Sequence, residues 1–193
     1  MAPHVMVGYH TPAAVLGDKE TAVAQIINEL LVSRSAPLYQ KLKYKKQSVT
    51  DLWIADDPVA NDPKWLLLDS ELMLDRFHKD GESYLSDVQQ DLIGGLDDLK
   101  HFSRQPDAVK TLEVVKSRVR NDLLAGLDST GSIAEFFAVF YRFSRDTGAI
   151  DKSMAAIQSL TPADVDTYAR KYFTPNRRVI ATMWADQNQK EAK

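Results

Sequence analysis

The chain has 193 residues, of which 44% are apolar and 26% are charged, and it carries a formal net charge of −3. That balance is typical of a globular domain with a substantial core, and it argues against the concentrated basic surface of a nucleic-acid-binding protein. The chain has no cysteine, which excludes disulfide bonds, thiolate zinc sites and cysteine nucleophiles. No apolar run approaches the roughly 18 residues of a membrane-spanning helix, so we expect a single domain without a membrane span.

A strand and then an amphipathic helix open the chain. Residues 4–10 are β-prone and predict a strand. Asp18 is suited to cap a helix over about residues 19–33, because apolar residues recur there at helical spacing at Ala22, Val23, Ile26, Ile27, Leu30 and Leu31. Residues 33–37 break this helix, and a short second helical piece begins at Leu38.

Two more strands and several helices follow. Residues 47–56 and 65–73 predict strands that pair as a hairpin across a turn-rich stretch at 56–63. After Gly81 the pattern changes to helices, with apolar stripes at Leu85, Val88, Leu92, Leu96 and Leu99, and then at Val109, Leu112, Val115, Val119 and Leu123. The pair Gly94-Gly95 falls inside the first stripe, where it favours close helix packing or a kink.

Aromatic residues dominate the next helix. Spacing predicts that most of them belong to the core, namely Phe136, Phe137, Phe140 and Tyr141. Phe143 falls off this stripe, in a position suited to face a partner.

The last part of the chain supplies a capped helix and a closing strand. A short helix at 152–158 leads to a capping box at Thr161–Asp164, with Pro162 at the first helical position, and the last helix runs to Pro175. Residues 178–184 predict the final strand. The order of elements predicts an α+β fold, a mainly antiparallel sheet with helices packed on one face.

Three segments together resemble one family of proteins. They are Val7–Pro12, the segment Ser33–Leu42 with its Leu38-Tyr39-Gln40-Lys41-Leu42 end, and Ser159–Phe173 with the pattern Thr-Pro-Ala-Asp-Val. Their order and spacing are similar to those of the insulinase (pitrilysin) family of zinc peptidases. The resemblance implies two homologous halves that close like a clamshell around a peptide, with zinc held by an H-x-x-E-H motif on the first helix of one half.

The resemblance also implies that this chain is the non-catalytic, C-terminal half. The degenerate metal-motif positions are Gln25, Asn28 and Glu29, which cannot build the zinc site. The four histidines, His4, His10, His78 and His101, include no pair at i,i+4 spacing on a helix. We therefore expect no catalytic residue, no metal and no cofactor in this chain, with zinc in a homologous partner half. We expect residues 1–193 to form one domain excised from a longer chain.

Substrate contacts are expected at two positions by the same resemblance. Several family members carry Arg and Tyr seven residues apart, and these side chains can hydrogen-bond the substrate backbone and the developing oxyanion. The matching positions are Lys43 and Thr50; lysine keeps the charge but lacks the guanidinium fork, and threonine is much shorter than tyrosine. An exposed sheet edge could also bind peptide by strand addition.

The sequence leaves three hypotheses open. The first is an inactive half-domain that helps hold peptide for a zinc-bearing half, in the periplasm because bacterial relatives are commonly exported. The second is a non-enzymatic scaffold domain with the same fold. The third is an unrelated α+β binding domain, which predicts that the strands at 4–10 and 178–184 do not share a sheet with the hairpin.

Overall fold

A single antiparallel sheet organises the domain. The computed structural model describes residues 2–55 and 62–184, and the predicted turn at 56–63 therefore lies largely outside the described residues. The sheet has the strand order β2-β3-β1-β4, formed by β1 (His4–Thr11), β2 (Val49–Ala55), β3 (Lys64–Leu72) and β4 (Arg178–Met183). The β2–β3 hairpin is confirmed, and β1 pairs with both β3 and β4. This shared sheet contradicts the topology that an unrelated binding domain predicts.

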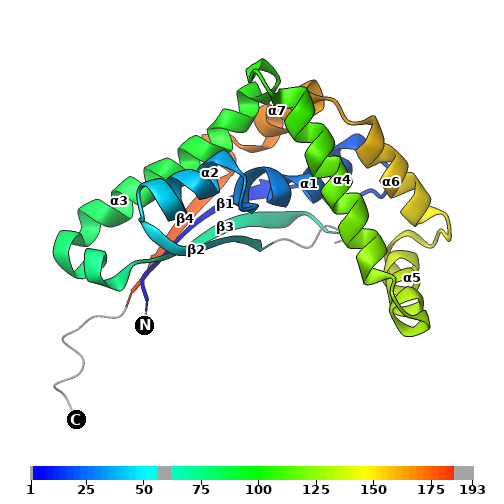
Figure 1. Cartoon of the computed structure of the whole chain (residues 1–193), viewed down its shortest axis with the longest axis horizontal. Coiled ribbons are helices and arrows are strands. Elements are labelled where there is room, and N and C mark those ends of the chain that lie inside the picture. The colour runs from blue at the N-terminus through cyan, green and yellow to red at the C-terminus, as the bar shows by residue number, and fades with distance from the viewer. Residues whose placement is uncertain (1, 56–61, 185–193) are drawn as a thin grey trace, which may run out of the picture.

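The helices cover one face of the sheet, and the predicted α+β class is confirmed (Figure 1). Side chains of a strand alternate between the two faces, so Val5, Val7 and Tyr9 of β1 are fully buried beneath the helices. The Tyr9 ring packs on Phe173 at a centroid distance of 5.0 Å, which joins the sheet to the last helix.

The first helices follow the prediction closely. Helix α1 spans Lys19–Val32, and the Asp18 carboxylate caps it by accepting the Thr21 N–H at 2.8 Å. The short α2 (Pro37–Tyr39) continues directly into η1 (Gln40–Lys45), a π-helical turn.

The long helix α3 spans Leu74–Asp98 and corrects one prediction. It begins before Gly81 rather than after it. Gly81 adopts a φ of +57°, which divides the helix into two segments. The predicted close packing is confirmed at Gly95, since a Cβ built there would lie 2.7 Å from the Leu38 side chain. The chain continues through η2 (Leu99–Arg104) into α4 (Ala108–Gly126).

Helix α5 (Thr130–Ser144) contradicts the prediction of an aromatic core. None of its residues is buried, and Phe137 and Tyr141 are 46% and 47% exposed. Helical spacing predicts an apolar face, but it does not reveal whether the same chain covers that face. No single helix in the described ranges is long and apolar enough to span a membrane, although α4 and α5 together, with a 120° bend between them, have the required length and composition.

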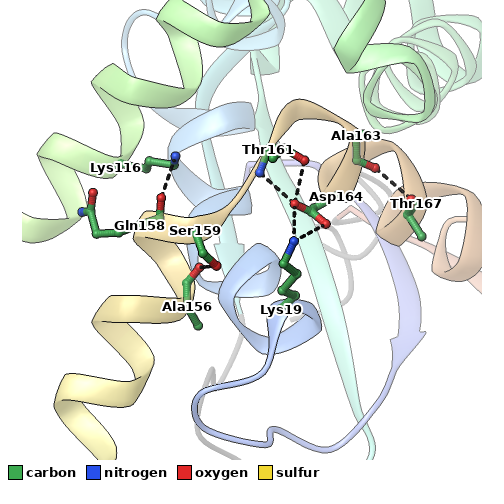
Figure 2. Close-up of polar contacts among 9 residues, drawn as sticks. All are labelled: Lys19, Lys116, Ala156, Gln158, Ser159, Thr161, Ala163, Asp164 and Thr167. Atoms are coloured by element: carbon green, nitrogen blue, oxygen red, sulfur yellow. Dashed lines mark hydrogen bonds and ion pairs between the residues drawn. The ribbon is translucent and has the colours of Figure 1, made fainter.

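The closing helices are α6 (Ala149–Ser159), α7 (Pro162–Tyr172) and the short η3 (Pro175–Arg177). Figure 2 shows the capping box at the start of α7, where the Asp164 carboxylate accepts the Thr161 N–H at 2.8 Å and its hydroxyl at 2.7 Å. The Lys19 ammonium donates to the same carboxylate at 3.0 Å and so links α1 to α7 (Figure 2).

Candidate functional site

Helix α1 carries the three degenerate metal-motif positions, and the structure gives each a different environment. The Gln25 side-chain oxygen accepts a hydrogen bond from the Ser153 hydroxyl of α6 at 3.0 Å. Asn28 is exposed to solvent. Glu29 lies against α4, where its carboxylate accepts from the Arg118 guanidinium at 3.4 Å. Gln25 and Glu29 are four residues apart and therefore share one face of α1.

Arg118 places a positive charge beside this face of α1. Its guanidinium also donates to the Ser35 hydroxyl at 2.9 Å, so it is held from two directions. A cation next to Glu29 disfavours a second cation at the same place.

The residues present do not fit a zinc ion. An amide at Gln25 and a single carboxylate already paired with Arg118 do not provide a zinc ligand set. Across residues 2–55 and 62–184, no group of three His, Asp or Glu side chains is placed to hold a metal ion.

A cavity of about 420 Å³ opens next to Glu29. It lies between the end of α1, α2, the end of α3, η2 and α4, and its apolar lining includes the buried side chains of Leu30, Leu99, Phe102 and Val115. Charged groups, among them Glu29, Lys41 and Arg118, also line it. An apolar cavity lined by a few polar groups is suited to bind one bulky apolar side chain while its polar neighbours contact the main chain attached to it.

The two expected substrate-contact positions occupy different elements. Lys43 is half-buried on η1. Thr50 is the extra residue of a β-bulge in β2, and its hydroxyl donates to the Glu71 carbonyl at 3.2 Å. The Thr50 hydroxyl is therefore already bonded to the backbone of the neighbouring strand.

Two lysines near Lys43 have a structural role. Lys41 and Lys46 hold the Asp91 carboxylate of α3 at 2.9 and 2.5 Å. Burial alone would raise the pKa of Asp91, but these two hydrogen bonds outweigh it and bring that pKa below its ordinary value. Together they attach η1 to α3.

Sequence reasoning missed Arg118, Ser35 and Ser153. Arg118 is 89 positions from Glu29 along the chain, and Ser153 is 128 positions from Gln25. Pairings at such separations leave no local pattern, so no signal within the single sequence identifies these residues as neighbours of the degenerate motif.

Comparison with known proteins gives a consistent result at the level of fold. No protein-family model and no curated protein matches the sequence. Among solved structures, the inactive peptidase domain of a candidate zinc protease from Bordetella parapertussis is similar, with a TM-score of 0.76 and 16% identity over 95% of this chain and 93% of that chain. A protease from Helicobacter pylori is similar with a TM-score of 0.73 and 17% identity, over 95% of this chain and 41% of that chain.

A third similar structure is the periplasmic protease PqqL from Escherichia coli, with a TM-score of 0.66 and 14% identity over 96% of this chain and 19% of that chain. At these identities the likeness concerns the fold, and the chain has the fold of an inactive peptidase half-domain, as the resemblance predicts. It spans only 41% of the Helicobacter protease and 19% of PqqL, but nearly all of the Bordetella domain.

Proposed function

We propose that this chain is the inactive half of a two-part zinc peptidase, which closes a peptide chamber together with a homologous, zinc-bearing half. The observation that carries the proposal is the pairing of Arg118 with Glu29. It puts a protein cation at the helix face on which, by the resemblance, an active half would hold its metal. The domain thus keeps the fold of the peptidase but lacks the residues that would bind the catalytic metal.

The cavity beside Glu29 gives such a half a role in peptide binding. An apolar peptide side chain seated on Leu30, Leu99 and Phe102 would anchor the peptide, while Glu29, Lys41 and Arg118 contact its main chain. Lys43 and Thr50, which the resemblance assigns to substrate contact, lie outside the lining of this cavity and would contact the peptide elsewhere. The zinc-bearing half would supply the metal-bound water and the general base. We place the assembled peptidase in the periplasm, a proposal supported by the likeness to a periplasmic protease.

Peptidase activity on mixing tests this function. The chain is assayed on an unfolded protein substrate alone, with the zinc-bearing half encoded upstream or in a neighbouring gene, and with the same half lacking its zinc-ligand histidines. We expect hydrolysis only in the mixture with the intact zinc-bearing half, and we expect a chelator to abolish it. Chelator-sensitive hydrolysis by the isolated chain, with metal bound stoichiometrically, would refute the proposal.

A scaffold role is the second candidate function. It is favoured by Thr50, because the hydroxyl expected to contact substrate is instead bonded to the Glu71 carbonyl. A scaffold would associate stably with its partner half and leave both mixtures inactive. Stable association without hydrolysis would therefore support this candidate over the peptidase.

A further inference from the structure

Helix α5 has an inner side that packs on the domain and an outer side that the described chain leaves exposed. Figure 1 shows α5 at the end of α4 and beside α6, away from the sheet. On its inner side, Phe136 and Phe140 are half-buried and line a small cavity together with Leu123 of α4 and Met154 of α6. These contacts attach α5 to the domain and leave its other side free.

The outer side of α5 is apolar. A rotation of about 100° per residue places five exposed side chains on it, namely Ile133, Ala134, Phe137, Ala138 and Tyr141. We call these five residues the α5 face. Single exposed apolar residues are ordinary, but a continuous apolar face along a helix usually marks an interaction surface.

Two opposite charges lie along one edge of the α5 face. Glu135 and Arg142 are seven residues apart, which is close to two helical turns, so they follow the same edge. Both are exposed, and neither forms an ion pair within residues 2–55 and 62–184. The Arg142 guanidinium lies over the Phe143 ring at 5.4 Å.

This order of charges is complementary to itself in an antiparallel helix pair. When two copies of one helix pack antiparallel about a twofold axis, each edge of the face meets the same edge of the other copy. An axis between residues 138 and 139 is about 5 Å along the helix from both Glu135 and Arg142, so each carboxylate is level with the guanidinium of the other copy. A parallel pair would instead bring this edge against the opposite edge, where Ile133 and Phe140 carry no charge.

The same register also matches large side chains to small ones. It places Tyr141 of one copy level with residue 136 of the other, midway between Ala134 and Ala138, where two methyl groups leave room for the ring. The two Phe137 side chains lie about 4.5 Å apart along the helix axis, within reach of an aromatic pair across the interface. Charge and shape therefore select one arrangement.

We infer that the α5 face binds a second copy of this chain, as an antiparallel α5–α5 pair with Glu135 of each copy beside Arg142 of the other. One helix from each copy buries less area than a standard protein interface, so we expect a weak dimer, with a Kd of about 10–100 µM. The inference does not rest on the proposed function, and it leaves a one-to-one ratio of the chain to a zinc-bearing half unchanged.

Charge exchange across the pair provides the test, by sedimentation velocity of the chain alone from about 2 to 400 µM. Glu135→Arg and Arg142→Glu each replace both ion pairs by like-charge contacts, and the double variant Glu135→Arg/Arg142→Glu restores both pairs with the charges exchanged. Matched controls make the same kinds of change at exposed positions of α3, Glu82→Arg and Lys79→Glu. Circular dichroism verifies that each variant is folded.

Each single variant at position 135 or 142 should dimerise at least about tenfold more weakly than the native chain. The double variant and both α3 controls should dimerise like the native chain, and the two single variants should pair with each other when mixed. A native chain that stays monomeric at 400 µM would overturn the inference, as would equal weakening in the α3 controls or failure of the mixed variants to pair. Binding of a monomeric chain to phosphatidylglycerol vesicles, lost in Phe137→Gln, would assign the α5 face to a lipid surface instead and would also overturn it.

Discussion

Restoring two histidines to α1 tests whether Arg118 is the group that now excludes a metal. The variant Gln25→His/Glu29→His places imidazoles four residues apart on one helix face, a spacing that can hold zinc. We expect it to bind zinc poorly while Arg118 remains, and better when Arg118→Gln is added.

The size of the difference follows from the structure. The Arg118 guanidinium lies 3.4 Å from the Glu29 carboxylate, so a zinc ion bound at position 29 would be about 5 Å from that charge. Coulomb repulsion between charges of +1 and +2 at this distance is about 1.7 kcal/mol even at the dielectric constant of water, and that corresponds to about a tenfold or larger change in affinity.

Competition with a chromophoric chelator measures zinc affinity for both histidine variants, with Arg118→Gln alone as the control for non-specific binding. The triple variant should bind zinc about tenfold or more tightly than the double variant, and the control should not compete. Affinities of the two histidine variants within twofold of each other would refute the assignment to Arg118.

Three stability predictions check other parts of the account by urea unfolding. Gly95→Ala should be about 1–3 kcal/mol less stable than the matched variant Gly94→Ala, because only the methyl at position 95 collides with Leu38, whereas the space around Gly94 is open; equal stabilities would contradict this packing. Burial raises the pKa of Asp164, but hydrogen bonds outweigh it and hold that pKa below its ordinary value of 3.8. The group therefore contributes stability above about pH 4 that is lost as the pH falls through its lower folded pKa. Asp164→Asn should cost about 1 kcal/mol at pH 7 and progressively less below pH 4, whereas a cost independent of pH would count against the assignment. Phe137→Gln should change stability by less than about 0.5 kcal/mol because the ring is 46% exposed, and a loss above 2 kcal/mol would place it in the core.

The strands, the caps and the shared sheet could be predicted from the sequence because each has a local signal. The alternation of residue types along positions 4–10 indicates that β1 has one buried face. Asp18 and the Thr161–Asp164 capping box each act within a single helical turn. The resemblance to a peptidase half-domain then supplied the arrangement of these elements, which local patterns do not contain.

The rest of the site could not be predicted, for physical reasons. The Glu29–Arg118 pair is formed by tertiary packing of α4 on α1, and nothing in the sequence near either residue requires it. The spacing of the aromatic residues of α5 predicts a buried helix face, yet the described chain leaves Phe137 and Tyr141 exposed. Periodicity shows that one face of a helix is apolar, but only the tertiary structure shows what covers that face.

The central claim is that this domain has lost its metal and depends on a zinc-bearing half. Its most direct test is the zinc content of the purified chain, and of the complex that it forms with that half, measured by elemental analysis alongside native mass spectrometry. We expect a one-to-one complex with one zinc ion, and no stoichiometric zinc on the chain alone. One zinc ion per isolated chain would contradict it.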